Sequence, residues 1–278
     1  MEKRAVRKGF GLEAICKVYG YSRTAYYKCV RKDLERQKES ERALRVVRAI
    51  RKNQPRAGGK KLHRHIRSEL KSEGIGRDRL FDLLRQKGLL IKRKKSYRKT
   101  TDSRHAFRKY GNLIKDKDVW KERDVVASDI TYVETEEGFC YLSLITHLSS
   151  RKIVGWELSR DLRMEGSLSA LTKAVRQFPE TRGMIHHSDR GVQYCCHKYV
   201  DYLKDRGIQV SMTEEDHVYE NALAERVNGI LKEEFGLGAR LRTYEMARKM
   251  VKQAVKTYNE ERLHMSLNFQ TPAQVFAA

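Results

Sequence analysis

Three acidic residues stand out by their positions in the sequence: Asp129 in ASDITYV, Asp189 in HHSDRG and Glu225 in ENALAERVNGILK. Asp129 lies among apolar or small neighbours, where a charge is costly unless a cation compensates it. Carboxylates held close together repel each other or take up protons unless metal is bound. Magnesium prefers oxygen ligands, and two such ions about 3.5–4 Å apart can drive an in-line phosphodiester displacement. An Asp at a strand end is usually a turn residue, so the prediction rests on all three acids together.

The elements that must position these acids follow from alternating and helical patterns of apolar residues. Three β-branched and aromatic runs separated by short turns predict three consecutive antiparallel strands, with helices and two shorter strands after them. The order βββ-α-β-α-β-α-α predicts an α/β fold of the ribonuclease-H-like type, a mixed five-stranded sheet with flanking helices. The expected strands are 123–133, 139–148, 152–159, 183–189 and 208–213, and the expected helices are 164–178, 197–207, 220–235 and 243–264.

The helix expected to carry Glu225 has a continuous polar face. Asn221, Asn228 and Lys232 share this face with the acid, at positions i, i+7 and i+11 of a helical period. Amide and ammonium groups in such a row can hold phosphate or sugar, so these three residues are candidate DNA contacts. The alternative is that they form an ordinary solvated face of the helix.

The charge of the chain is divided unequally along its length. Of the formal net charge of +23, residues 1–120 hold 37 Lys+Arg against 13 Asp+Glu (+24), whereas residues 121–278 hold 22 against 23 (−1). So large a local excess indicates a polyanionic partner, and nucleic acid first, because each neutralised phosphate adds salt-dependent affinity. A basic surface that serves only solubility is the alternative.

Two helical segments and a basic linker are expected before the sheet. Residues 1–40 contain a helix, a turn at Gly20 and a second basic helix, which predicts a helix-turn-helix with Arg23, Lys28 and Arg31 as candidate DNA contacts, although an ordinary helical hairpin is the alternative. A second helical DNA-binding domain over 41–95 ends in the candidate contacts Lys94 and Lys95. The expected basic linker is 96–120 and the expected catalytic core is 121–278.

The cysteines and histidines give little support to a disulfide or zinc framework. Five cysteines without CxxC spacing favour a reducing cytoplasm, and the start of the chain has no apolar signal core and no membrane-length apolar run. The histidines and cysteines of HHSDRGVQYCCH fit no common zinc pattern, so no zinc is expected. His187 near Asp189, and Arg262 and His264 near the end of the last helix, are candidate neighbours of the site, with structural roles equally open.

Several stretches together resemble one family. SDITYV, HHSDRGVQY and ENALAERVNGILKEEF, with thirty-five residues between Asp189 and Glu225, are similar to the Asp-Asp-Glu (DDE) signature of transposases. YNEERLHMSLNFQTPAQVF, YRKTTDSRHAFRKYGNLI and QPRAGGKKLHRHIRSEL resemble the closing motif, the stretch before the core and the N-terminal region of one group among them. This group is the OrfB-type, second-reading-frame subunit of the IS-three insertion-sequence family, whose core is similar to that of retroviral integrases.

The resemblance implies a function and its partners. Asp129, Asp189 and Glu225 would be a catalytic triad that binds two magnesium or manganese ions. Water would attack at the end of the element, and the freed 3′-hydroxyl would attack another phosphodiester. The implied partners are double-stranded DNA at terminal inverted repeats and target, further copies of the chain and the upstream-frame (OrfA) product, with no membrane. Such a bacterial protein would be cytoplasmic, and nucleoid-associated when bound to DNA.

One residue departs from this family pattern, and two other functions stay open. His147, in LITHLSSRK, stands where relatives often carry an Asp outside the triad. A DNA-binding protein with a degenerate catalytic domain is one rival, which three intact acids argue against. A ribonuclease-H-like nuclease is the other, which the fold alone does not exclude.

Overall fold

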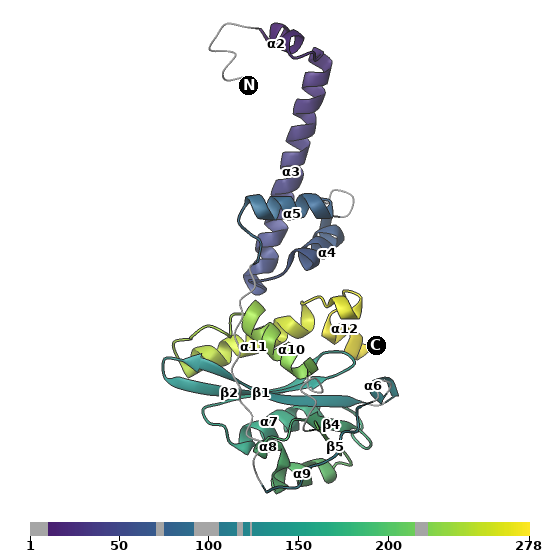
Figure 1. Ribbon diagram of the computed structural model, residues 1–278, viewed down its shortest axis with the longest axis vertical. Coiled ribbons are helices and arrows are strands. Elements are labelled where there is room, and N and C mark those ends of the chain that lie inside the picture. Colours follow the sequence, from purple (N-terminus) through teal and green to yellow (C-terminus); the bar gives the residue numbers. More distant parts are fainter. Residues whose placement is uncertain (1–10, 71–74, 92–105, 116–118, 123, 215–221) are drawn as a thin grey trace. The chain divides into compact units, whose positions relative to one another are not determined.

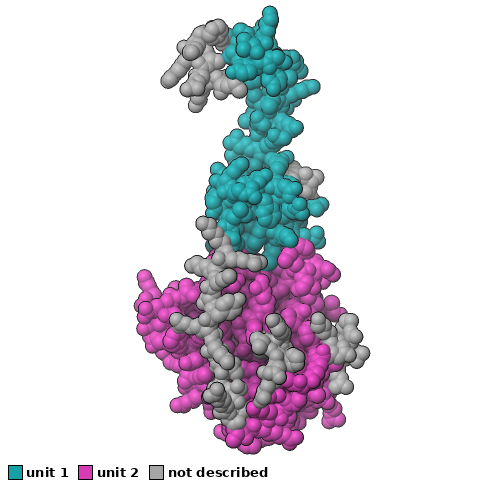
Figure 2. Space-filling view, in the orientation of Figure 1, with its two compact units in different colours: residues 1–52, 57–91 teal, residues 53–56, 92–278 magenta. Residues whose placement is uncertain are grey.

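A computed structural model describes residues 11–70, 75–91, 106–115, 119–122, 124–214 and 222–278. The chain divides into two compact units, one made of residues 1–52 and 57–91 and the other of residues 53–56 and 92–278 (Figure 2). Each unit has its own apolar core, and each is described separately below.

Over its described residues, the N-terminal unit is all-α. Helix α2 (Leu12–Val18) ends before Gly20, whose φ of +73° suits a turn that residues with a β-carbon rarely adopt. Ser22 then caps the next helix by accepting a hydrogen bond from the Ala25 N–H at 3.1 Å. The remaining helices are α3 (Arg23–Asn53), α4 (Gly59–Leu70) and α5 (Arg77–Gln86).

Helix α3 packs along only part of its length. Its side chains become buried from Ala43 onward, and they form a core with Leu62 and Ile66 of α4 and with Leu80 and Leu84 of α5. The helix runs without a break through residues 40 and 41, so the expected segments 1–40 and 41–95 share one helix. The expected boundary after residue 95 lies outside the described residues.

The second unit is built on a five-stranded mixed sheet, as predicted. The strand order is β3-β2-β1-β4-β5, with β1 antiparallel to β2, β2 antiparallel to β3, and β1, β4 and β5 parallel. Helices cover both faces, so the predicted ribonuclease-H-like layout is confirmed (Figure 1). The strands are β1 (Val125–Thr135), β2 (Gly138–His147), β3 (Ile153–Ser159), β4 (Ile185–Ser188) and β5 (Gln209–Met212).

The two faces of the sheet carry different helices (Figure 1). One face packs against α10 (Ala222–Glu234) and α11 (Tyr244–Glu260), around Val133 and Leu142. The other packs against α7 (Met164–Val175) and α9 (His197–Lys204). Gly155 allows α7 to lie this close, because a β-carbon there would come within 2.2 Å of the Ala170 carbonyl oxygen.

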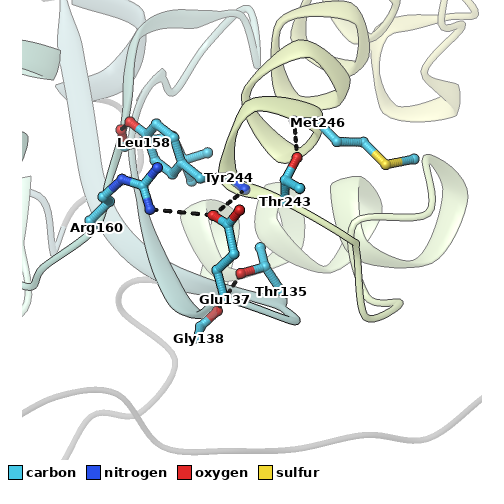
Figure 3. A network of polar contacts seen from close by, with 8 residues as sticks. All are labelled: Thr135, Glu137, Gly138, Leu158, Arg160, Thr243, Tyr244 and Met246. Atoms are coloured by element: carbon cyan, nitrogen blue, oxygen red, sulfur yellow. Dashed lines mark hydrogen bonds and ion pairs between the residues drawn. The ribbon is translucent and has the colours of Figure 1, made fainter.

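A polar network at the turn between β1 and β2 fixes the start of α11 (Figure 3). The Glu137 carboxylate accepts hydrogen bonds from Arg160 at 3.3 Å and from the Tyr244 N–H at 3.1 Å. The Tyr244 hydroxyl in turn donates to the Leu158 carbonyl at 2.6 Å. Since α10 leads into α11, these contacts help to hold α10 in place over the sheet.

Short elements that the apolar pattern did not predict complete this unit. They are too short to show a period, although the last one has a capping box, in which Thr271 and Gln274 exchange hydrogen bonds. Among the described residues, no helix is both long and apolar enough to cross a membrane. The short helices are α6 (Val119–Glu122), α8 (Val192–Cys195) and α12 (Pro272–Ala277), with a 3-10 turn at Met265–Leu267.

Candidate active site

Asp129 lies in the middle of β1, opposite Leu144 of β2, and its side chain is half-buried. Its Oδ2 accepts a hydrogen bond of 2.6 Å from the Asn228 amide of α10, so the carboxylate faces that helix. Burial, followed by the charge of Asp189, raises the pKa of Asp129 to about 7, while the Asn228 hydrogen bond opposes the rise. Burial and the neighbouring carboxylates therefore disfavour the charged form of Asp129 unless a cation offsets it.

Asp189 follows β4 directly, as predicted, and it is half-buried. Its Oδ1 accepts a hydrogen bond of 2.9 Å from the Gly191 N–H, which shapes the turn into α8. A β-carbon on residue 191 would lie 2.9 Å from that same oxygen. Glycine at 191 therefore lets the backbone come close to the acid.

Glu225 lies in the first turn of α10, and its side chain is exposed. Partial burial and then the charge of Asp189 raise its pKa. Glu225 also contributes to the raised pKa of Asp129. The three predicted acids are therefore close enough to act on one another electrostatically, from three separate elements.

The acids are near one another without forming a closed ligand cage. Within the described ranges, no group of three His, Cys, Asp or Glu side chains is arranged to hold a metal ion. The three acids come from separate elements, and one oxygen of Asp129 is held by Asn228. The donor set still suits a hard divalent cation, because it consists of carboxylate and amide oxygens.

Two residues on the polar face of α10, Asn228 and Lys232, interact with Asp129, which the sequence pattern did not predict. Asn228 is buried and bonds to Asp129, and its own Oδ1 has no hydrogen-bond partner among the described residues. The Lys232 ammonium lies 3.9 Å from the centre of the Tyr132 ring, and Asp129 partly offsets the lowering of its pKa by burial. Asn221 lies outside the described residues.

The two histidines of β4 are buried in a different environment. Nε2 of His186 lies 2.6 Å from the Ser128 hydroxyl and 2.9 Å from that of Tyr199, and burial lowers the pKa of His186 to about 3. Nδ1 of His187 lies 2.9 Å from the Ser211 hydroxyl of β5. These contacts join β4 to β1, α9 and β5, and a role for His187 beside the three acids stays a prediction.

Arg262 and His264 are buried and hold the end of α11 against α10. The Arg262 guanidinium makes two hydrogen bonds of 2.9 and 2.7 Å to Glu234, and it lies 2.7 Å from Nε2 of His264. Glu234 is nine residues beyond Glu225 on α10, about 13.5 Å along a helix that rises 1.5 Å per residue. Both residues therefore have partners away from the three acids.

His147 has local partners, and so do Cys195 and Cys196, which are adjacent to each other in the sequence. Nδ1 of His147 lies 2.8 Å from the Ser150 hydroxyl and Nε2 lies 3.2 Å from Asp124, while its ring contacts two phenylalanines. Burial, opposed by Asp124, lowers the pKa of His147. The Cys195 thiol contacts Met212 and that of Cys196 points to the Gln193 carbonyl, so the two side chains diverge.

The N-terminal candidate contacts are solvent-exposed where they are described. Arg23, Lys28 and Arg31 lie in the first three turns of α3, and Arg23 has a loose ion pair of 4.0 Å with Glu13. Lys94 and Lys95 lie outside the described residues.

Comparisons with known proteins agree with this architecture. Two family models, each described as an integrase core domain, match residues 121–217 and 206–272. The chain is 32% identical over 266 residues to a 31 kDa protein of insertion element IS600 from Shigella sonnei, a match that spans 93% of this chain and 96% of that protein. It is 29% identical over 280 residues to the InsF transposase of IS3A from Escherichia coli, over 95% and 93% of the two chains.

Solved structures show more distant likeness. The catalytic core of HTLV-2 integrase in complex with magnesium matches with a TM-score of 0.44 and 16% identity, over 55% of this chain and 95% of that one. A simian T-cell lymphotropic virus intasome matches with a TM-score of 0.48 and 16% identity, over 80% and 71%.

The class of protein is a transposase with an integrase core, which is a DDE polynucleotidyl transferase. Within that class, the chain belongs to the IS3 family of insertion-sequence transposases, in the group of InsF and OrfB.

Proposed function

We propose that this transposase cleaves the ends of its insertion element and joins the freed 3′-hydroxyl to a second phosphodiester, with two magnesium or manganese ions as cofactors. The observation that carries the proposal is the placement of Asp129, Asp189 and Glu225 on β1, after β4 and on α10, where Asp189 raises the pKa of both other acids and Glu225 raises that of Asp129. Bound divalent cations would activate the attacking oxygen and stabilise the leaving one.

The protein residues have separate tasks in this proposal. Asp129 and Asp189 would provide ligands from the sheet, and the exposed Glu225 side chain would close on the site from α10. Asn228 orients Asp129 through its 2.6 Å hydrogen bond. Lys232, beside Tyr132, would contact a DNA phosphate near the reacting bond.

DNA is the proposed partner of both units. The excess of basic residues in the first 120 positions suits the phosphate backbone of the terminal repeats and target, with Arg23, Lys28 and Arg31 exposed for contact. Transposition joins separate DNA sites, so further copies of the chain are proposed partners as well. The upstream-frame product is another.

The experiment uses labelled terminal-repeat duplex with magnesium or manganese, and it compares wild type with Asp189→Asn and Glu225→Gln. Both variants should lose nicking and joining while they bind DNA normally in calcium. Glu233→Gln is the matched control, because Glu233 is exposed on the same helix and should be dispensable. DNA binding without cleavage by any version would favour the degenerate DNA-binding protein, and cleavage confined to RNA–DNA hybrids would favour the nuclease.

A further inference from the structure

Two aromatic side chains lie together near the candidate active site. Tyr132 of β1 and Phe139 of β2 meet edge to face, with their ring centres 5.6 Å apart. Phe139 is 47% exposed and Tyr132 is half-buried, and neither belongs to any of the apolar core clusters that the described residues form. Two adjoining rings, one of them half open to solvent, form a surface on which a flat group can stack.

A lysine connects this pair of rings to the three acids. The Lys232 ammonium lies 3.9 Å from the centre of the Tyr132 ring. Burial lowers the pKa of Lys232, and the charge of Asp129 opposes that shift, so the lysine is close to both the ring and the acid. A DNA phosphate bound by this ammonium would have its nucleotide within reach of the ring.

The position of Tyr132 along β1 fits a nucleotide close to the reacting bond. Tyr132 is three residues from Asp129, about 10 Å along a strand, which equals about three steps of roughly 3.4 Å between the phosphates of one DNA strand. Strand β4 pairs with β1 only along Val125–Ala127, so both residues lie where β1 continues beyond β4. They point to opposite faces of the sheet, yet Lys232 of α10, on the Asp129 side, reaches the Tyr132 ring around this edge.

The hairpin that carries Phe139 is fixed on both sides of its turn (Figure 3). The Thr135 hydroxyl donates a hydrogen bond of 2.7 Å to the carbonyl of Gly138, the residue directly before Phe139. Glu137, in the same turn, accepts a hydrogen bond of 3.1 Å from the Tyr244 N–H. Little conformational freedom is therefore lost when a ligand stacks on the Phe139 ring.

The charges around the rings favour a base over a phosphate. Glu134 lies directly opposite Phe139 in the register of β1 and β2, and its side chain is 44% exposed, 4.0 Å from Arg240. A carboxylate repels a phosphate, but it can accept a hydrogen bond from the amino group of a base. A base stacks on a protein ring only after it has left the double helix, so the nucleotide that fits this surface is unpaired.

We infer that Tyr132 and Phe139 stack on an unpaired base of the reacting DNA strand, within about three nucleotides of the scissile phosphate. This inference rests on the proposed strand-transfer function. The two rings are binding residues in it, because they hold the opened strand end while Lys232 holds a phosphate. The scissile phosphate is thereby kept beside the acids.

The first test is photocross-linking of the wild-type full chain to terminal-repeat duplexes in calcium. Each duplex carries one 5-iodouracil, placed in turn at every position within about three nucleotides of the scissile phosphate. Irradiation couples this base to an aromatic side chain that stacks on it, and mass spectrometry identifies the residue. At least one position should couple to Tyr132 or Phe139, and coupling to neither from any position would overturn the inference.

The second test measures cleavage at saturating DNA. Phe139→Leu keeps an apolar side chain without a stacking face and should slow cleavage roughly 10-fold, whereas Phe139→Tyr should recover most of the rate. The matched control is Met265→Ser, which removes another exposed apolar side chain of the same unit and should leave the rate unchanged. An abasic nucleotide at the cross-linked position should slow wild type by the same factor and should slow Phe139→Leu no further.

The outcomes separate this inference from the proposed chemistry. A Phe139→Leu rate equal to that of wild type, or losses from the variant and the abasic nucleotide that multiply at every position, would overturn the stacking contact and leave the proposed function intact. A wild type that couples through Phe139 but cleaves no DNA would contradict the proposed function and leave the contact standing. Thermal denaturation should give the same melting temperature for all variants, because Phe139 lies outside the apolar cores.

Discussion

Two groups of polar residues are built around strands β1 and β4, and they differ in the charges that their side chains bring together. The histidine group, His186 and His187 with Ser128, Tyr199 and Ser211, contains neutral donors and acceptors at 2.6–2.9 Å. In the carboxylate group, Asp129, Asp189 and Glu225, the charge of Asp189 raises the pKa of the other two acids. Each histidine is hydrogen-bonded through one ring nitrogen within the fold, whereas the acids gather like charges that a bound cation would offset.

The pleat of β1 places Ser128, with His186, on one face of the sheet and Asp129 on the other, and His187 faces the same side as Asp129. Successive side chains of a strand point to opposite faces, so Ser128 meets His186 on one side while Asp129 meets Asn228 on the other. A shift of register by one residue would exchange the two environments. The pairing of Val126 with His186 and of Ala127 with His187 between β1 and β4 therefore fixes which residue of β1 faces Asn228.

The largest expected effect comes from Asp129→Asn, which should change activity and stability in opposite directions. Loss of a cation ligand should reduce strand joining at least about 1000-fold, equivalent to roughly 4 kcal/mol of activation free energy. In metal-free buffer the same substitution should raise the melting temperature of the catalytic unit at pH 8, because a buried charge is removed. The joining assay and thermal denaturation in EDTA measure the two quantities.

The gain in stability should depend on pH. The pKa of Asp129 is raised to about 7 in the folded protein, so its protonated form favours folding, and that contribution is lost as the pH rises through 7. The advantage of Asp129→Asn over wild type should therefore be small at pH 5 and larger at pH 8. An advantage that is the same at both values would contradict the raised pKa.

His186→Ala tests the histidine group. The substitution would leave a cavity and remove the hydrogen-bond partner of the Ser128 and Tyr199 hydroxyls. The free energy of unfolding should therefore fall by about 3 kcal/mol. Metal affinity per folded molecule should be unchanged. Urea denaturation and a magnesium titration of the folded fraction measure these two quantities. Reduced metal affinity with normal stability would show that His186 takes part in metal binding.

The sequence predicted the fold well because the strands and long helices have clear periods. β-branched runs predicted β1, β2 and β3, and the apolar spacing of 220–235 predicted α10. It also placed the three acids on their elements. The four-residue helices α6 and α8 escaped prediction because a single turn has no period to detect.

The partners of individual side chains depend on tertiary contacts that local pattern does not contain. Asn228 was expected to face DNA, yet it is 99 residues from Asp129 in sequence and bonds to it. The pair of Arg262 with Glu234 spans 28 residues and joins the ends of two helices. The sequence indicated this contact only by placing Asn228 on the same polar face of the helix as Glu225.

Asn228→Ala should have an intermediate effect, since its side chain holds one oxygen of Asp129 through a hydrogen bond. Removal of its 2.6 Å hydrogen bond should lower activity roughly 10- to 100-fold and raise the magnesium concentration needed for half-maximal rate. The control is Glu233→Gln on the same helix. A variant with slower joining and an unchanged magnesium requirement would show that the amide acts in some other way than through Asp129.

The smallest expected effect is that of Tyr199→Phe, which removes one hydroxyl from the histidine group and keeps the aromatic ring. The ring stays packed, and Nε2 of His186 loses one contact of 2.9 Å while it keeps Ser128 at 2.6 Å. Unfolding free energy should fall by about 1 kcal/mol and strand joining should be unchanged. Tyr202→Phe, on the same helix with Arg206 over its ring, should change neither quantity. If Tyr199→Phe slowed strand joining at full stability, the two groups would be coupled through the sheet. The histidine group would then affect activity as well as stability.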